Sequence, residues 1–333
     1  MEHAHDHRPD HPRVPWTVLA IVCVAQFMVI LDVTVVNVAL PAIGDAFGTA
    51  AGDLQWAVTA YLLFGGSLLL LGGRASDLIG RRRVFLAGLT VFTAASLGSG
   101  LAWSEGSLVV ARAAQGVGAA LLSPAALSIV TTTYAGPQRA TALAVWGGIG
   151  AAGGAIGLVL GGMLTTWLSW RWIFAINVPI GLVTAVIALR AVPASGGRVR
   201  AALARLDLPG AALATGALVL LVLATDGVRD HGWGSARTLG LYAAAAAAFA
   251  AFASVERAVR RPLVTPAIWR VRSLTWSAFT MLAGTGLLIG TFFLNSVLLQ
   301  DGLGWSALET GLAFLPMAVM VGAGVHLASH LLP

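Results

Sequence analysis

Ten apolar stretches, each long enough to cross a lipid bilayer, follow one another along this chain of 333 residues. A helix needs about 20 apolar residues to span the hydrocarbon core. Open strands are excluded there because lipid cannot satisfy their backbone groups, and the alternation of a membrane barrel is missing, so we expect helices. The expected helices cover residues 16–40, 54–73, 84–103, 107–134, 140–165, 172–191, 208–225, 237–254, 274–299 and 308–328.

The composition places the chain among integral membrane proteins. Hydrophobic residues make up 58% of it and charged residues 10%, whereas soluble domains carry about 25% charged residues. The net charge of +6 does not indicate a nucleic-acid partner, because the basic residues, all arginine, recur at every second loop instead of gathering on one face. The lone Cys23 lies in the first apolar stretch and is interpreted as a packing residue.

The arginines also predict the orientation. If the N-terminus is cytoplasmic, Arg171, Arg229 and Arg237 lie outside, Arg112 is embedded, and every other arginine lies on the cytoplasmic side. Membrane proteins carry an excess of basic residues in their cytoplasmic loops, so this distribution favours a cytoplasmic N-terminus. The N-terminus is polar and leads directly into a full-length span, so no cleavable signal peptide is expected.

Asp32 is the residue that most clearly suggests a function. It is the one acid placed in the interior of an expected span, where an ionisable side chain costs about 2.5–3.5 kcal/mol. Its expected partner is Arg112, the one embedded base. At 1.5 Å per residue, the expected depths of Asp32 and Arg112 in the membrane differ by about 5 Å. Such a carboxylate can take up and release a proton. The alternatives are a structural ion pair, or a hydrogen-bonding role for Asp32 with Thr34 and Asn37 as partners.

Further polar, small and aromatic residues have two interpretations each. Gln115 and Thr34 either line a cavity or join helices by hydrogen bonds. The glycines at 153, 157 and 161 share one helix face, which favours close helix packing over gating. Trp56, Tyr61, Phe64, Phe292, Phe293 and Asn295 either form a cavity for lipophilic cations or act as anchors and packing residues.

The absence of several catalytic and nucleotide-binding motifs narrows the possible functions further. There is no phosphate-binding loop, zinc-ligand spacing or nucleophile elbow, so we expect neither an enzyme nor ATP-driven transport, and no bound metal or other cofactor. The histidines of the N-terminal tail are interpreted as part of a disordered segment, with metal binding as the alternative; they are His3, His5, His7 and His11.

Four motifs carry a family resemblance. They are Leu31–Pro41 (LDVTVVNVALP), Gly72–Arg83 (GGRASDLIGRRR), Leu108–Gly118 (LVVARAAQGVG) and Trp170–Pro179 (WRWIFAINVP). In this order they resemble the major facilitator superfamily, and more narrowly its fourteen-span drug:proton antiporters of the EmrB/QacA type. The resemblance covers the chain after about residue 14.

The resemblance implies a fold and a domain order. The expected fold is an all-α integral membrane protein of the major facilitator type. Its expected parts are a His-rich cytoplasmic tail (1–15), an N-terminal six-helix bundle (16–191), a cytoplasmic linker (192–207), an extra helix pair (208–254), a basic cytoplasmic segment (255–273) and the start of a C-terminal bundle (274–333).

The resemblance also implies a function: export of amphipathic or cationic drugs across a bacterial plasma membrane in exchange for protons, with the proton gradient as the energy source. The implied proton-coupling and substrate residues are Asp32, Arg112, Thr34, Asn37 and Gln115. The implied conformational latch is formed by Gly73, Asp77, Gly80 and Arg81. The implied packing or gating glycines are Gly153, Gly157, Gly161 and Gly162.

Two departures leave alternatives open. Leu158 stands where the family's fifth-helix motif has a proline, which removes an expected kink. The chain also contains ten expected spans instead of fourteen, so we expect it to be C-terminally truncated. A metabolite or lipid exporter of the same superfamily is the first alternative function, and a non-transporting remnant is the second.

Overall fold

The computed structural model describes residues 16–49, 54–194, 206–259, 262–263, 271–317, 319–320 and 323–324. All regular secondary structure in these ranges is helical, which confirms the predicted class. The expected His-rich tail lies outside the described residues, as do parts of the two expected basic segments (192–207 and 255–273).

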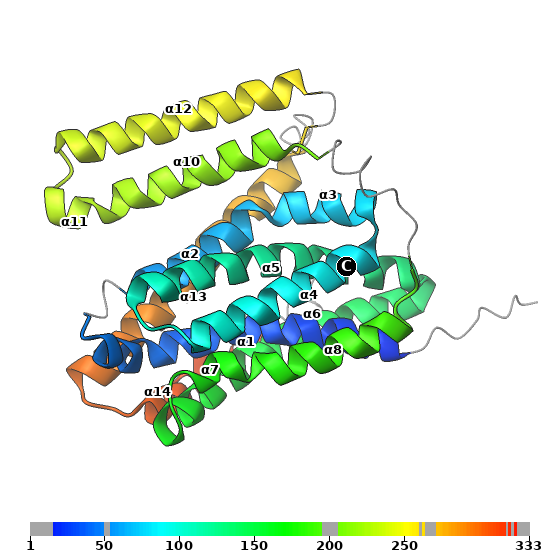
Figure 1. Ribbon diagram of the computed structural model, residues 1–333, viewed down its shortest axis with the longest axis horizontal. Helices are drawn as coiled ribbons and strands as arrows, with labels where there is room; N and C mark the ends of the chain where they lie inside the picture. The colour runs from blue at the N-terminus through cyan, green and yellow to red at the C-terminus, as the bar shows by residue number, and fades with distance from the viewer. Residues whose placement is uncertain are drawn as a thin grey trace, which may run out of the picture.

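The first unit is a bundle built around α1 (Figure 1). Its helices are α1 (Trp16–Phe47), α2 (Gln55–Ser67), α3 (Leu69–Ile79), α4 (Arg81–Gly100), α5 (Glu105–Thr133), α6 (Gly136–Trp167), α7 (Trp172–Ala175) and α8 (Asn177–Ala191). Local sequence explains two of the boundaries. Gly80 ends α3 at a φ of 111°, which a residue with a side chain rarely adopts. Ser104 begins α5 with a reciprocal capping box to Ser107.

Glycines let α4 and α5 approach each other closely. A Cβ atom on Gly88 would lie 2.7 Å from the amide nitrogen of Leu122, and one on Gly118 would lie 2.7 Å from the Cα of Phe92. Larger side chains at these positions would force the two backbones apart. Small residues serve this purpose in membrane bundles, where helices associate mainly through packing.

The described helices agree with the expected spans, with one exception. Eight are long and apolar enough to cross a membrane, and a ninth span is the pair α2 and α3, which is bent by 45°. The expected tenth span appears among the described residues only as the shorter apolar helix Ala307–Met317. Residues 325–328 at its end lie outside the described part.

A helical hairpin lies beside the bundle on the side of α2 and α3 (Figure 1). It consists of α10 (Leu208–Asp226), the short α11 (Val228–His231) and α12 (Ala236–Ala258). Two hydrogen bonds join it to α2: the Trp56 indole donates to Asp226 Oδ2 over 2.9 Å, and the Thr215 hydroxyl donates to Ser67 over 3.1 Å.

The last described helices return to the bundle. They are α13 (Arg272–Val297), the π-helical turn η2 (Leu298–Gly302) and α14 (Ala307–Ala313). α14 packs against α6, and a capping box between Ser306 and Glu309 begins it. Ser296 is the one buried residue of α13, so this helix meets the bundle near its C-terminal end.

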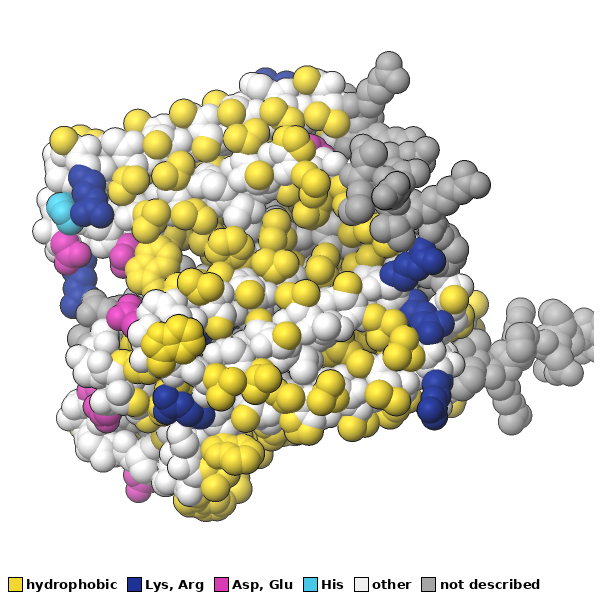
Figure 2. All heavy atoms as spheres, viewed as in Figure 1, with side chains coloured by type: hydrophobic (Ala, Val, Ile, Leu, Met, Phe, Trp, Pro, Cys, Tyr) yellow, Lys and Arg dark blue, Asp and Glu magenta, His cyan; other side chains and the backbone are white. Residues whose placement is uncertain are grey.

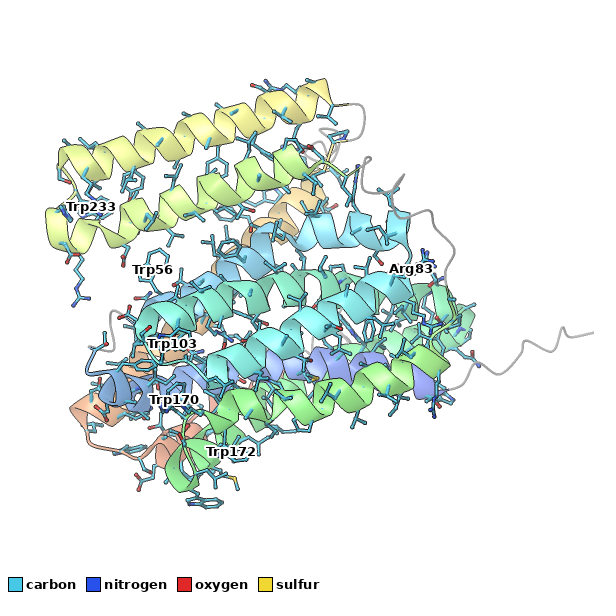
Figure 3. The ribbon with its side chains drawn as sticks, viewed as in Figure 1. Trp56, Arg83, Trp103, Trp170, Trp172 and Trp233 are labelled. Carbon is cyan, nitrogen blue, oxygen red and sulfur yellow. The ribbon has the colours of Figure 1, made fainter. Side chains whose placement is uncertain are left out.

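The surface fits a protein embedded in lipid. Figure 2 shows hydrophobic side chains over the flank of the helices, with arginines at both ends and acidic residues mostly at one of them. Figure 3 shows Trp103, Trp170 and Trp172 near the end opposite Arg83. Tryptophans gather at the membrane–water interface, so the flank between these ends has the chemistry of a membrane-spanning region.

Candidate functional site

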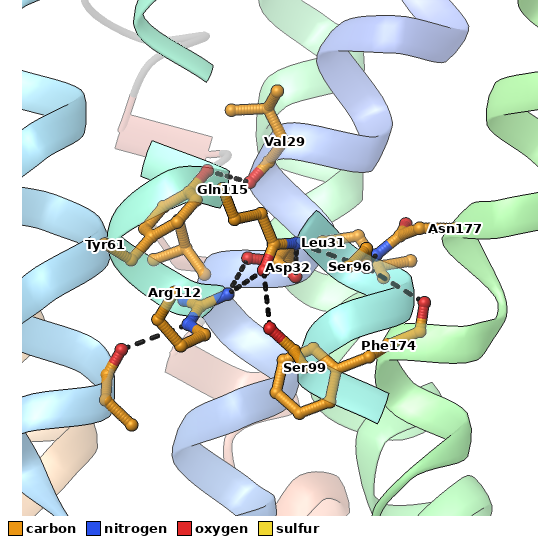
Figure 4. A network of polar contacts seen from close by, with 12 residues as sticks. Val29, Leu31, Asp32, Tyr61, Ser96, Ser99, Arg112, Gln115, Phe174 and Asn177 are labelled. Carbon is orange, nitrogen blue, oxygen red and sulfur yellow. Dashed lines mark hydrogen bonds and ion pairs between the residues drawn. The ribbon is translucent and has the colours of Figure 1, made fainter. Parts of the chain in front are cut away.

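Asp32 lies in the middle of α1, fully buried inside the bundle. Its Oδ2 accepts a hydrogen bond from Arg112 Nη1 of α5, and the two side chains form an ion pair. Its Oδ1 accepts a bond of 2.7 Å from Gln115 Nε2, one helical turn further along α5. The expected pairing of Asp32 with Arg112 is therefore present, and Gln115 completes the carboxylate's shell (Figure 4).

The guanidinium of Arg112 is enclosed by the neighbouring helices. Its Nε donates to the backbone carbonyl of Ala57 over 3.0 Å, and its Nη1 also donates to Gln115 Oε1 over 2.9 Å. Its central carbon lies 4.2 Å from the ring centre of Tyr61 and 5.6 Å from that of Phe174. Such contacts stabilise a desolvated cation by about 2 kcal/mol, so α2 and α7 help to keep this charge inside the bundle.

A chain of hydrogen bonds extends from Gln115 to α4 and α8. Gln115 Nε2 donates to Ser96 Oγ over 3.2 Å, and Ser99 Oγ donates to Gln115 Oε1 over 3.4 Å. Ser96 Oγ also accepts from Asn177 Nδ2 over 3.1 Å and donates to the carbonyl of Phe174 over 3.0 Å. All of these polar side chains are fully buried. The site is thus a buried network shared by several helices (Figure 4).

Ser96, Ser99 and Asn177 were not among the residues selected from the sequence. A weak signal for them exists: the two hydroxyls lie three residues apart in an apolar segment, and Asn177 belongs to the motif Trp170–Pro179. Residues three apart share a helix face. That periodicity does not show which neighbouring helix the face meets.

Thr34 and Asn37 follow Asp32 on α1 but do not bond to it. The Thr34 hydroxyl donates to the carbonyl of Leu31 over 3.0 Å, and Asn37 Nδ2 donates to the carbonyl of Val33 over 2.8 Å. Both side chains are thus engaged with their own helix. The hypothesis that they are the hydrogen-bonding partners of Asp32 is therefore wrong in this conformation.

The glycines of α6 lie at two helix contacts. Gly153, Gly157 and Gly161 face α1, and a Cβ on Gly161 would lie 2.9 Å from the Cα of Val35. Gly162 faces α14 instead, where a Cβ would lie 2.6 Å from the carbonyl oxygen of Ala307. The positions are packed closely, as one of the two interpretations expected.

Leu158, which replaces the expected proline, is buried between α1, α13 and α14. α6 runs as an unbroken α-helix through this position. A proline here would lack the backbone N–H and would favour a kink. The leucine keeps the helix continuous and adds an apolar side chain to the contact with α14.

The residues of the expected latch lie at the turn between α3 and α4. Gly73 and Asp77 belong to α3, where Asp77 is exposed, and Gly80 forms the turn. Arg81 begins α4, and its Nε donates to Ser128 Oγ of α5 over 2.8 Å. This bond joins the turn to the same bundle. A latch to another half of the protein stays a prediction.

The candidate aromatic residues point to different places. Tyr61 faces Arg112, whereas the indole of Trp56 bonds to Asp226 of the hairpin. Phe292 packs edge-on against Phe314, with ring centres 5.0 Å apart. These three residues therefore do not line one common cavity.

The sequence profile of the Major Facilitator Superfamily matches residues 22–332. The chain belongs to this superfamily. Membership makes it a multi-pass membrane protein of a transporter family, and not an enzyme.

Similar proteins of this superfamily include exporters of antibiotics and resistance proteins. The chain is 42% identical over 320 residues to the cephamycin export protein CmcT of Amycolatopsis lactamdurans, covering 95% of this chain and 65% of that protein. It is 41% identical over 327 residues to the puromycin resistance protein pur8 of Streptomyces alboniger, covering 98% of this chain and 64% of that protein. It is 39% identical over 317 residues to the lincomycin resistance protein of Streptomyces lincolnensis, covering 92% and 63%. The chain thus spans less than two thirds of the length of these relatives.

Proposed function

We propose that this superfamily member exports amphipathic or cationic small molecules in exchange for protons. Three of the similar proteins are named for export of, or resistance to, cephamycin, puromycin and lincomycin, which supports an exported compound of similar size. The order of the four sequence motifs supports the fourteen-span drug:proton antiporters as the subfamily. The proposed location is a bacterial plasma membrane, with the N-terminus in the cytoplasm.

The observation that carries the proposal is the buried pair of Asp32 and Arg112. With Asp32 ionised, the two charges balance within the dry bundle. A proton on Asp32 would leave the Arg112 guanidinium buried without its counter-charge, and removing one partner of a buried pair is strongly unfavourable. Proton uptake therefore favours a rearrangement that hydrates Arg112 or gives it another anion.

This rearrangement is how the proton would drive export. A cationic substrate also favours an ionised Asp32, because opposite charges attract strongly in a medium of low dielectric constant. Proton and substrate then compete for the same electrostatic site. Their mutual exclusion couples inward proton movement to outward substrate movement, with a coupling of about 1–3 kcal/mol being typical for linked ligands.

Substitution of Asp32 tests this function. In inverted membrane vesicles, Asp32→Asn is expected to lower proton-driven uptake of puromycin and of a lipophilic dye cation at least about tenfold, since the carboxylate can no longer exchange a proton. Asp45→Asn is the matched control, because Asp45 lies exposed near the C-terminal end of the same helix. The control should transport normally, with both variants at equal levels in the membrane.

The outcomes separate the alternatives. Undiminished uptake by Asp32→Asn would overturn the proton-coupling role. Uptake of neither compound by the unsubstituted chain, together with proton-driven movement of a metabolite or lipid, would favour the alternative substrate class. No proton-driven flux at all would contradict the proposed activity of this chain.

A further inference from the structure

Pro41 leaves one backbone carbonyl of α1 without its helical partner. In an α-helix, the amide of each residue donates to the carbonyl four residues earlier, and proline has no amide hydrogen. Pro41 lies inside α1, so the carbonyl of Asn37 receives no such bond. Asn37 is 3% exposed. A buried carbonyl without a donor is costly, and another part of the protein has to supply one.

The missing donor comes from the far end of α13. Ser296 Oγ donates to the carbonyl oxygen of Asn37 over 2.8 Å, across a separation of 259 residues in the chain. Gln300 of η2 donates through Nε2 to the next carbonyl, that of Val38, over 3.1 Å, and to Ser296 Oγ over 3.0 Å. Two side chains therefore donate hydrogen bonds to two successive carbonyls, those of the residues four and three positions before the proline.

The contact is concentrated on these groups. Ser296 is fully buried, while apolar residues earlier in α13 are open: Trp276 is 69% exposed and Leu282 is 72% exposed. The side of the contact that accepts these bonds is also buried. Val38 belongs to a buried cluster with Leu158, Ala307 and Phe314 of α6, α14 and the turn that follows it.

We propose that Ser296 and Gln300 lock α13 against α1 at the outer end of the bundle, and that Pro41 creates the acceptor for this lock. This inference rests on the proposed export function, in which the outer end has to open to release substrate. Separation of α13 from α1 removes the donor from the Asn37 carbonyl until water replaces it. Closure of the outer end is favoured for as long as the contact stays dry.

The lock is also close to the proton site along the same helix. Asn37 lies five residues after Asp32 on α1, a rise of about 7.5 Å. A tilt of α1 that follows proton uptake at Asp32 therefore moves the two acceptor carbonyls relative to α13. Ser296 and Gln300 are thus positioning residues that convert movement of α1 into opening.

A mutant cycle with Pro41 tests the lock. In the full chain in proteoliposomes, the background Cys23→Ser, Val38→Cys reports opening through the reaction of its single thiol with a membrane-impermeant maleimide. Ser296→Ala is expected to raise the labelling rate about 5-fold to 100-fold, because the Asn37 carbonyl then lacks a donor in the closed state. Ser296→Thr keeps the hydroxyl and should label at the original rate.

Pro41→Ala provides the decisive comparison, because alanine restores an amide donor to the Asn37 carbonyl within α1. In that background, Ser296→Ala should change labelling less than about twofold. An equal effect of Ser296→Ala in both backgrounds would overturn the proposal and indicate a packing role for the serine. No effect in either background would overturn it as well.

A second variant keeps the test decisive if Ser296→Ala fails to fold. Gln300→Leu removes the bond to the Val38 carbonyl, and half-buried Gln300 tolerates an apolar side chain of similar length. It should also increase labelling, and unchanged labelling would contradict the lock. The labelling needs no substrate and no proton gradient, so a labelling result that contradicts the lock leaves the export proposal standing. Conversely, the lock stays testable if Asp45→Asn or the unsubstituted chain fails to transport.

Discussion

The guanidinium of Arg112 lies 4.2 Å from the ring centre of Tyr61, so an aromatic residue of α2 faces the buried cation of α5. The Tyr61 hydroxyl also donates to the carbonyl of Val29 on α1 over 3.3 Å. One side chain therefore supports the ion pair from two directions. The contact joins the helix of the cation to the helix of the carboxylate.

Tyr61 substitutions should separate these two contributions. Tyr61→Phe keeps the ring and loses the hydrogen bond, which is worth about 0.5–1.5 kcal/mol. Tyr61→Leu loses the ring as well and should cost about 2 kcal/mol more. The order of thermal stability in detergent should be wild type, then Tyr61→Phe, then Tyr61→Leu. Equal stability of the two variants would show that the ring contributes nothing to the cation.

Removal of Arg112 should be among the most damaging single changes. Arg112→Leu leaves the Asp32 carboxylate buried without its counter-charge, which typically costs about 3–5 kcal/mol. The double variant Asp32→Asn, Arg112→Leu removes both charges and should regain much of that stability. Equilibrium unfolding of the four proteins measures the coupling, and additive losses would contradict a close ion pair.

Gly161 and Gly154 form a matched pair on α6. A methyl group on Gly161 would meet the Cα of Val35 at 2.9 Å, whereas nothing lies within 4 Å of one on Gly154. Gly161→Ala should therefore destabilise the protein by about 1–3 kcal/mol through overpacking against α1. Gly154→Ala should be neutral or stabilise it by up to about 1 kcal/mol, the difference in helix propensity. Melting temperatures measure both, and equal shifts would argue against close packing of α1 and α6.

The link between the hairpin and the bundle should be weak at its exposed end. The hydrogen bond from the Trp56 indole to Asp226 is exposed to solvent. A cycle of Trp56→Phe and Asp226→Asn should give a coupling below about 1.5 kcal/mol, the upper value for a typical hydrogen bond. The Thr215 bond to Ser67 and the other contacts of α10 with α2 would then hold the hairpin. A coupling above about 3 kcal/mol would show that the hairpin is fixed mainly through Trp56.

The comparison of sequence and structure is clearest at α1. The apolar run predicted the span, and the embedded positions of Asp32 and Arg112 predicted their pairing, because each charge has few alternatives in lipid. Thr34 and Asn37 were expected near Asp32 as well, but both bond to carbonyls of their own helix. Short polar side chains can use local backbone acceptors, and sequence spacing does not reveal that choice.

The C-terminal end of α1 shows a second difference between the expected and the observed structure. α1 continues through Pro41 to Phe47, beyond the expected end at residue 40. Proline interrupts the hydrogen bonds of a helix, so a helix is not expected to continue through it without compensation. In the folded protein, Ser296 supplies a donor to the carbonyl that Pro41 leaves open. A contact from a distant helix thus stabilises the continuation of α1 through Pro41, which local sequence alone does not predict.

The sequence by itself determined the membrane-spanning helices and identified one buried acid and one buried base. These properties depend on local composition, since a charge in the middle of an apolar span is costly unless it is paired, whatever the arrangement of the helices. Tertiary structure alone decided that Ser96, Ser99 and Asn177 join the network, and that Ser296 meets α1. Those contacts depend on the rotation and depth of each helix relative to its neighbours, and packing between helices sets both.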